Sequence, residues 1–282
     1  MLRKHLRIVA IVLVLLWTCF PIYWMFLMSF KTPKDVTSYP PKFIFKPTLA
    51  NWENVLLGRK WTGTHYETVQ MEVLRYFKNS LIIATGATLL ALILGLPAAY
   101  SLARYKFFRK EDFAFTLLSF KFAPALLVVF GLYALYQTLN LYDTYIGLIL
   151  IHQLLLLPFV VWMMRSYFAA VPIEVEQAAR VDGFRWWGVF SKVTLPLVKP
   201  AIAATSVVAF IYSWNEFLYG YVLAGDISRP VTPSLLGFIS YERVLWGQMA
   251  AAASLAMVPS VVLSLFIQRY VVAGLSFGAV RG

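Results

Sequence analysis

The sequence predicts an all-α membrane protein with six transmembrane helices and a cytoplasmic two-helix coupling loop between the fourth and fifth spans. Composition is the first indication: 60% of the 282 residues are hydrophobic and 13% are charged, whereas soluble domains carry about 25% charged residues. So little polar material cannot cover a soluble core of this size. The second indication is patterning, because long apolar runs alternate with short segments rich in Lys and Arg.

The net charge of +12 is interpreted as a marker of membrane orientation. Lys and Arg gather in cytoplasmic loops and at lipid headgroups, so this charge does not indicate nucleic-acid binding. The single cysteine, Cys19, excludes an internal disulfide. No Cys/His spacing suggests a metal site. We therefore expect contact with membrane lipid, but neither a metal nor a nucleic-acid partner.

Each apolar run is compared with the roughly 20 residues that cross a bilayer. The first run continues past Trp17 and Phe20 with no small-residue cleavage site, so we expect a retained helix and not a signal peptide. Four prolines inside the runs, Pro97, Pro124, Pro158 and Pro259, are expected to mark kinks. The expected spans are residues 8–30, 79–103, 113–136, 144–164, 201–223 and 249–268.

Basic residues predict the topology. A cluster from Arg104 to Lys110 follows the second span and places that loop in the cytoplasm. Both termini are then cytoplasmic, and the whole chain, 1–282, is one transmembrane domain. Residues 31–78 become an external loop, although they contain eight Lys and Arg residues, including Arg59 and Lys60. The rule is weak for long loops, so we keep the external assignment.

The segment 171–200 is a polar insert between two apolar runs. Pro172 is suited to begin a helix because its missing N–H is unpaired there in any case. In this helix Val175, Ala178 and Ala179 are expected on one face. Gly183 then breaks the helix, and Asp182 is expected to cap a second amphipathic helix over residues 184–192.

Two interpretations of the insert follow from its residues. It is either a docking element for a partner protein or an interfacial helix pair on the inner leaflet. The acidic residues Glu174 and Glu176 count against the second interpretation, because the inner leaflet is itself anionic.

The insert resembles the EAA loop of permeases of binding-protein-dependent ABC importers. The matching residues are Gln177-Ala178-Ala179, then Gly183, then Val193-x-Leu195-Pro196. Further segments resemble the carbohydrate-uptake, maltose-permease-like branch of this family, and the resemblance covers nearly the whole chain. These segments are Phe20-Pro21, Ser29-Phe30-Lys31, Trp214-Asn215-Glu216-Phe217, Gln268-Arg269-Tyr270, Gly274-Leu275 and 278–282.

The resemblance implies a transporter subunit in the bacterial inner membrane. Its partners would be a second homologous permease, two ATP-binding subunits and a periplasmic or lipid-anchored solute-binding protein. ATP and Mg²⁺ would bind the partner ATPase subunits, since this chain has no G-x-x-x-x-G-K-[ST] loop. The chain itself would bind no cofactor and have no catalytic residue. The implied ATPase-coupling residues are Glu174, Glu176, Gln177, Ala178, Ala179, Arg180, Asp182, Gly183, Leu195 and Pro196.

One position departs from the family pattern. The family's glutamate is expected to pair with a basic residue of the ATPase, and here it is Gln177. The contact would then be a neutral hydrogen bond, or Glu176 or Glu174 would take over the charged role.

Ionisable residues inside spans usually face an interior or a water-filled path. For Lys121 the alternative is snorkelling towards the membrane surface. For His152 it is a helix–helix hydrogen bond. Glu216 would instead meet water, or hold the turn at Trp214-Asn215-Glu216. Planar polar groups and aromatic faces suit sugars, and the chain offers Tyr133, Tyr136, Tyr212, Trp214, Asn215 and Tyr219 near these positions.

Other functions were weighed against a sugar permease. A permease for amino acids or ions would use the same scaffold. An ion-gradient-driven carrier would need a titrating group near the membrane centre, for which Lys121 is the candidate. A membrane enzyme is disfavoured, because the spans show no paired carboxylates, metal spacing or nucleophile constellation.

Overall fold

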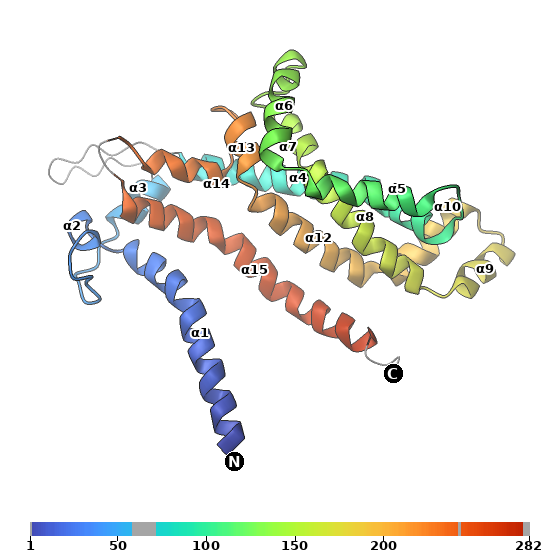
Figure 1. Cartoon of the computed structure of the whole chain (residues 1–282), viewed down its shortest axis with the longest axis horizontal. Helices are drawn as coiled ribbons and strands as arrows, with labels where there is room; N and C mark the ends of the chain where they lie inside the picture. Colours follow the sequence, from blue (N-terminus) through green and yellow to red (C-terminus); the bar gives the residue numbers. More distant parts are fainter. Residues whose placement is uncertain (1, 58–71, 242–243, 279–282) are drawn as a thin grey trace. The chain divides into compact units, whose positions relative to one another are not determined.

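The computed structural model describes residues 2–57, 72–241 and 244–278, and these ranges are helical almost throughout. They contain no strand, only an isolated β-bridge between Ile239 and Val244. The chain divides into two compact units, Met1–Phe77 with Pro233–Val258, and Lys78–Thr232 with Pro259–Gly282. Figure 1 labels the helices in chain order. The expectations for Arg59, Lys60 and residues 279–282 lie outside the described residues.

Four helices are long and apolar enough to cross a membrane. They lie in α1 (Leu2–Met28), α4 (Val73–Arg104), α8 (Gln153–Ala170) and α15 (Trp246–Gly278). The number rises to six if each of two bent helix pairs is counted as one span. The helical membrane class is confirmed, and the count of six spans stays a prediction.

The first unit contains α1, α2 (Pro33–Val36), α3 (Ala50–Leu57) and the beginning of α15. The apolar residues of α1 are almost all exposed, as expected of a helix whose surroundings are lipid or another subunit. Asn51 joins the elements of this unit. Its Nδ2 donates to the carbonyls of Ser29 and Lys31, both at 2.9 Å. A Cβ on Gly247 would lie 2.5 Å from this nitrogen, so α15 needs glycine there.

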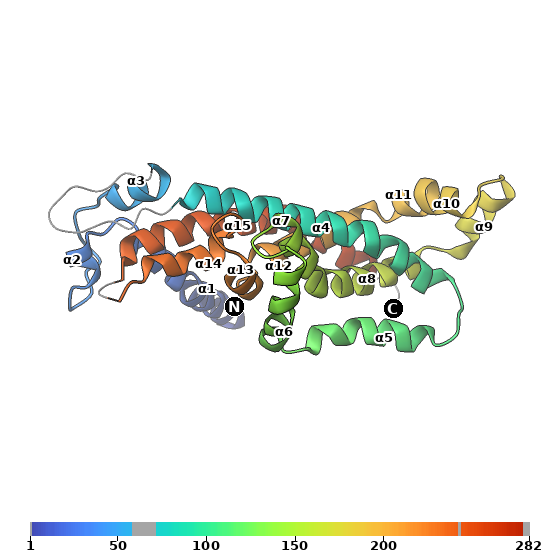
Figure 2. The same ribbon diagram turned by 90° about the horizontal axis from the view of Figure 1, so that it is seen from above.

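The second unit is built on α4, α8 and α12 (Lys199–Trp214), with α5 (Lys110–Ser119) against α8 (Figure 2). Small residues of α4 allow the close approach of α8: a Cβ on Gly95 would lie 2.7 Å from the Val160 side chain. The buried cluster between these helices includes Leu156, Met164 and Phe168, none of them measurably exposed.

The expected third span, 113–136, is broken. Residues Lys110–Phe122 form α5 and a short 3₁₀ turn, and α6 (Ala125–Thr138) leaves them at 92°. Pro124 lacks the N–H that would continue the helix. It also forces Ala123 into an extended conformation, with φ −64° and ψ 131°. The expected kink at Pro124 is therefore a sharp break, while Pro97, Pro158 and Pro259 lie inside continuous helices.

Several helix boundaries differ from the expected spans. Helix α4 begins at Val73, α8 continues to Ala170, and α15 continues to Gly278, beyond the expected end of the sixth span at residue 268. The expected fourth span is interrupted at His152, after α7 (Tyr145–Ile151). The expected fifth span is interrupted after Trp214 and resumes as α13 (Leu218–Leu223).

Asp143, in the turn between α6 and α7, fixes the loop that follows α13. Its carboxylate accepts hydrogen bonds from the Ile227 amide at 3.0 Å, and from the Ser228 amide and hydroxyl at 2.8 Å each. Burial acts to raise the pKa of Asp143, but these hydrogen bonds outweigh it and hold the pKa below its usual value. Gly225 leaves room for this carboxylate, because a Cβ there would lie 2.6 Å from Oδ2.

Candidate coupling loop and solute pathway

We call residues 171–200 the coupling loop, after the role expected of them. It begins with α9 (Ile173–Val181), for which Pro172 is the residue before the first turn. Gly183 ends α9 with φ +91°, a left-handed conformation that favours glycine. The Phe184 amide then donates to the Ala179 carbonyl at 3.1 Å and closes the turn. The expected break at Gly183 is thus present, but Asp182 is the C-terminal cap residue of α9 and not an N-cap.

The second half of the loop is less regular than expected. A three-residue helix, α10 (Trp186–Gly188), continues as a π-helical turn over Val189–Thr194 and then as α11 (Leu195–Leu197). Val189 and Phe190 are buried, whereas Trp186 and Trp187 are 49% and 69% exposed. The two tryptophans therefore lie on the surface of the loop and not in its packed face.

The buried face of α9 is not the predicted one. Glu176 and Ala179 are buried, while Val175 and Ala178 are exposed. The apolar-face prediction was wrong because it sorted residues by polarity alone. Residues three apart lie on the same helix face. Glu176 is therefore buried on the same face as Ala179, because a partner compensates its charge.

That partner is Arg104, at the C-terminal end of α4. Its Nε lies 2.8 Å from Glu176 Oε1, and the two side chains are 9% and 7% exposed. Tyr100 Oη donates to Glu176 Oε2 at 2.9 Å, and Thr194 Oγ1 donates to Oε1 at 3.0 Å. Arg104 also donates from Nη2 to the Val171 carbonyl at 2.8 Å. The Glu176 carboxylate thereby ties α9 and the π-helical turn to α4, and Arg104 binds the first residue of the loop directly.

The exposed surface of the loop contains the other expected coupling residues. Gln177, Ala178 and Glu174 are exposed, and the Arg180 guanidinium lies 3.8 Å from the centre of the Trp186 ring. Val181 is 89% exposed. Leu195 and Pro196 lie in α11, where the loop turns back towards α12. Because Glu176 is engaged inside the chain, Glu174 is the acidic residue of α9 that remains at the surface.

Lys121 and Tyr212, two expected solute-pathway residues, lie together. The Lys121 Nζ is 5.5 Å from the ring centres of both Tyr212 on α12 and Phe159 on α8. The two rings meet edge to face, with centres 5.1 Å apart. Among the described residues Lys121 has no carboxylate partner, and the break after α5 leaves it exposed. A cation framed by two rings is suited to contact a polar solute.

His152, Glu216 and Tyr219 form a second, buried group. His152 Nδ1 lies 2.6 Å from Ser213 Oγ on α12, which is the helix–helix contact considered for this histidine. Its Nε2 lies 3.8 Å from Glu216 Oε2. The Glu216 carboxylate accepts the amides of Tyr219 and Gly220, so it caps α13 and holds the turn after Trp214. This group is a structural junction between α8, α12 and α13.

The remaining pathway candidates are spread out. Tyr133 is 39% exposed, contacts Tyr142 edge to face and accepts a hydrogen bond from Gln137. Tyr136 is buried and donates to the Gly147 carbonyl. Trp214 is 1% exposed and stacks on Phe210, and Asn215 is exposed at the end of α12. The structure therefore brings Lys121 and Tyr212 together, and leaves the others apart from them.

Sequence reasoning missed four residues of these groups: Tyr100, Arg104, Phe159 and Ser213. Arg104 was interpreted only as a marker of the cytoplasmic side. The sequence did single out Arg104, because it is the first cation after the long apolar run of the second span. The other three are ordinary residues of apolar helices, and only their neighbours distinguish them.

The helical membrane fold, with a polar loop anchored on a membrane helix, defines the membrane-spanning subunit of a transporter. The chain belongs to the family described as "Binding-protein-dependent transport system inner membrane component", which matches residues 91–277. It is therefore an inner-membrane permease subunit of an ABC importer, without an ATPase site of its own, and it works in a complex with other subunits.

Two relatives extend the likeness to nearly the full length. The "Probable ABC transporter permease protein y4oR" of Sinorhizobium fredii is 34% identical, over 95% of both chains. The "Diacetylchitobiose uptake system permease protein DasC" of Streptomyces coelicolor is 31% identical, over 97% of this chain and 96% of its own. A solved bacterial ABC transporter, described as importing the acidic polysaccharide alginate, has the same fold. Its matching chain gives a TM-score of 0.75 at 20% identity, over 95% of this chain and 96% of that one.

Proposed function

We propose that this permease subunit translocates a sugar, polyol or related polyhydroxy solute into the cytoplasm, using ATP hydrolysed with Mg²⁺ on partner subunits. The complex would contain a second homologous permease, two ATP-binding subunits and a periplasmic or lipid-anchored solute-binding protein. Both termini would be cytoplasmic, six spans would cross the bacterial inner membrane, and the segment 31–78 would be external.

The Arg104–Glu176 contact is the main support for a mechanism in which movement of an ATPase subunit is coupled to movement of the membrane helices. A force applied by an ATPase subunit to the surface of α9 would reach Glu176 within the same short helix. The buried pair would pass it directly to α4, since breaking such a pair leaves an uncompensated charge. The loop and the membrane helix would then move as one body between inward-facing and outward-facing states.

The docking face in this proposal contains Glu174, Gln177, Ala178 and Arg180, with the exposed tryptophans beside them. A surface that combines aromatic and Arg side chains is typical of protein–protein contacts. Gln177 would contribute a neutral hydrogen bond. Glu174 would supply the negative charge, because Glu176 already neutralises Arg104.

The solute class rests on two lines of support. One relative, DasC of Streptomyces coelicolor, is named as a permease of a diacetylchitobiose uptake system. Within this chain, Lys121 with its two aromatic neighbours, Phe159 and Tyr212, offers the combination of polar donor and ring face that sugars require. Transport of an amino acid or an ion by the same scaffold is the alternative.

Solute uptake into proteoliposomes tests the proposal. The complete complex, with its binding protein, would be loaded with ATP inside or outside and supplied with labelled mono- and disaccharides, amino acids and ions. We expect uptake of a saccharide or polyol that requires ATP on the ATPase side. Uptake without the ATPase subunits, or uptake driven by an ion gradient, would contradict the coupling scheme. Selective uptake of an amino acid would contradict only the solute class.

A further inference from the structure

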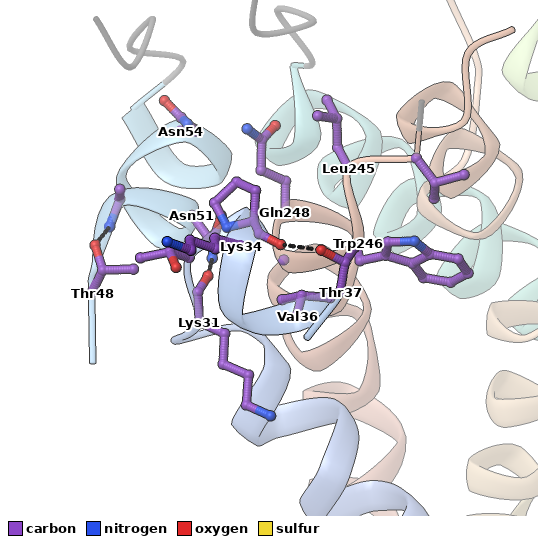
Figure 3. A pocket seen from close by; sticks show the side chains of 15 residues that line it. Lys31, Lys34, Val36, Thr37, Thr48, Asn51, Asn54, Leu245, Trp246 and Gln248 are labelled. Atoms are coloured by element: carbon purple, nitrogen blue, oxygen red, sulfur yellow. Dashed lines mark hydrogen bonds between the residues drawn. The ribbon is translucent and has the colours of Figure 1, made fainter. Parts of the chain in front are cut away.

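The first unit contains a cavity of about 460 Å³ that the translocation scheme does not use. Three segments line it: the turn after α1, the beginning of α3 and the beginning of α15 (Figure 3). All of its lining residues belong to this unit. Pockets of about 300–1,000 Å³ are the usual size for small-molecule ligands.

The cavity contains polar groups that have no hydrogen-bond partner among the described residues. Gln248 is only 8% exposed and lines the cavity, and its carboxamide makes no hydrogen bond with any described residue. This amide is open to the cavity, because it is not among the buried polar atoms without a partner in the described residues, and it can therefore bind a ligand. Asn54, half-buried on α3, and Lys34, on α2, also line the cavity and have no hydrogen bond or ion pair within the described ranges.

The frame around these groups is fixed. The Asn51 side-chain amide donates hydrogen bonds to the carbonyls of Ser29 and Lys31 and lies against Gly247. The Lys31 ammonium turns away from the cavity to the Trp24 ring, 4.1 Å from its centre. Figure 3 shows this side chain directed away from Asn54 and Gln248. The free groups are therefore presented by a rigid wall and do not compete with one another for partners.

The charge of the lining selects the ligand. None of the 15 lining residues, all within the described ranges, is acidic. The adjacent carboxylate of Asp35 is already held by Lys42 at 2.7 Å and by Thr32 at 2.8 Å. The open groups are one ammonium and two carboxamides, which together offer more donors than acceptors. Their complement is a carboxylate beside hydroxyl groups, and the apolar lining of Val36 and Leu245 suits the C–H face of a ring.

We propose that this cavity binds an acidic monosaccharide unit, with its carboxylate on Lys34 and its hydroxyls on Asn54 and Gln248. The site is formed by other residues than the Lys121 group and does not depend on which solute the complex imports. A transporter of neutral sugars would retain it, and its absence would leave the coupling scheme intact.

Titration calorimetry on the purified permease–ATPase complex, without its binding protein, tests the site. Glucuronate is the probe, glucose tests the need for the carboxylate, and acetate tests the need for the ring. We expect saturable glucuronate binding that is at least about ten-fold tighter than that of glucose or acetate, the equivalent of one charge-assisted hydrogen bond. Equal binding of acetate and glucuronate would show a non-specific anion site and overturn the proposal.

Variants assign the binding to this cavity. Lys34→Gln is expected to abolish the preference for glucuronate over glucose. Gln248→Leu and Asn54→Leu are each expected to weaken glucuronate binding by about ten-fold or more. Lys46→Gln, an exposed lysine of the same unit outside the cavity, is the matched control and is expected to bind normally.

Two results would overturn the assignment. One is unchanged glucuronate binding in both Gln248→Leu and Asn54→Leu, provided that their melting temperatures match the wild type. The other is competition by glycerol phosphate. If glycerol phosphate displaces glucuronate at a lower concentration than glucose or acetate does, and at a lower concentration than unlabelled glucuronate itself, the cavity is assigned to a lipid headgroup.

Discussion

Arg104 at the end of α4 and Glu176 in α9 form a buried ion pair, with 2.8 Å between Nε and Oε1. The two residues are 72 positions apart in the sequence. Tyr100 and Thr194 complete the coordination of the same carboxylate. The pair therefore joins a membrane helix, the first helix of the coupling loop and its π-helical turn at one point.

Breaking this pair is expected to destabilise the complex and to uncouple it. Arg104→Gln leaves Glu176 buried without its cation, a change that costs about 3–5 kcal/mol in buried pairs. We expect a lower melting temperature, and ATP hydrolysis that continues with little solute uptake. Arg109→Gln is the control: its pair with Asp112 is 68% and 63% exposed, so its loss should have little effect.

A double-mutant cycle separates the pair from its surroundings. If Arg104 and Glu176 act together, the Arg104→Gln/Glu176→Gln double variant should be less destabilised than the sum of the single variants. Coupling energies for such neighbours are roughly 0.5–3 kcal/mol. Strict additivity in denaturation of the purified complex would show that the two residues stabilise the loop independently.

Gly183 is expected to act through its backbone and not through crowding. A Cβ at this position would meet no atom within 4 Å, but φ is +91°. Gly183→Ala and Gly183→Val should therefore cost about 1–2 kcal/mol in the left-handed conformation, and Gly183→Asn less, since Asn tolerates that region better. The readout is solute imported per ATP hydrolysed, and we expect the order Gly, Asn, Ala, Val.

Gly131 provides the control for this series. A Cβ there would also have nothing within 4 Å, and its φ is not positive. Gly131→Ala should leave coupling unchanged or slightly stabilise α6, because Ala has the higher helix propensity. If Gly183→Val couples as well as Gly183→Asn, the left-handed turn has no role in transmission.

The Asp143 contact predicts a pH dependence of stability. Its pKa is lower in the folded chain than in the unfolded chain, so the folded state is stabilised when the carboxylate is ionised. This contribution is present above the unfolded pKa of about 4 and is lost as the pH falls through the lower folded value. Asp143→Asn keeps a residue suited to the local φ of +55° but removes the charge.

The measurement is the melting temperature of the complex between neutral pH and pH 3. We expect Asp143→Asn to melt below the wild type at neutral pH, with the difference shrinking as the medium becomes acidic. The hydrogen bonds of this carboxylate suggest about 1.5–3 kcal/mol. A constant difference across this pH range would exclude ionisation of Asp143 as the source.

Lys121 is expected to influence transport more than stability. It is exposed, and among the described residues its ammonium contacts the rings of Phe159 and Tyr212. Lys121→Met retains most of the packing of the aliphatic stem but removes the charge. We expect slower solute uptake at an unchanged melting temperature. Equal losses of uptake and thermal stability would favour a structural role for the lysine instead.

The sequence was sufficient for the membrane class and the family, while the coupling role of residues 171–200 stays a prediction. Long apolar runs, the break at Gly183 and the Pro172 start are local signals, and each is visible in the structure. The position of the break at Pro124 was predicted correctly, but its angle was underestimated. The loss of one N–H indicates where a helix is interrupted, whereas the angle depends on how the two segments pack.

The inward position of Glu176 could not be predicted in the same way. A glutamate in a polar segment is normally solvated, and its burial depends on Arg104 and Tyr100, which are distant in sequence. Glu216 differs: a role in holding the turn after Trp214 was one of its alternatives from the sequence, and its carboxylate caps α13 locally. A long-range polar pair such as Arg104–Glu176 leaves no periodic pattern in a single sequence.

The central claim is that the coupling loop contacts an ATPase subunit and does not lie on the membrane surface. Site-specific crosslinking in the assembled complex tests it most directly. In a Cys19→Ser background, Trp187→Cys introduces a thiol at a position that is 69% exposed. Tyr39→Cys does the same at a residue of the first unit that is 97% exposed and is expected outside.

We predict that Trp187→Cys crosslinks to the ATPase subunit with a yield that changes when ATP is added, while Tyr39→Cys does not crosslink to it. A transport-competent complex in which Trp187→Cys gives no such product, and in which brominated lipids quench a fluorophore attached to this cysteine, would contradict the claim. That result would identify the loop as an interfacial element.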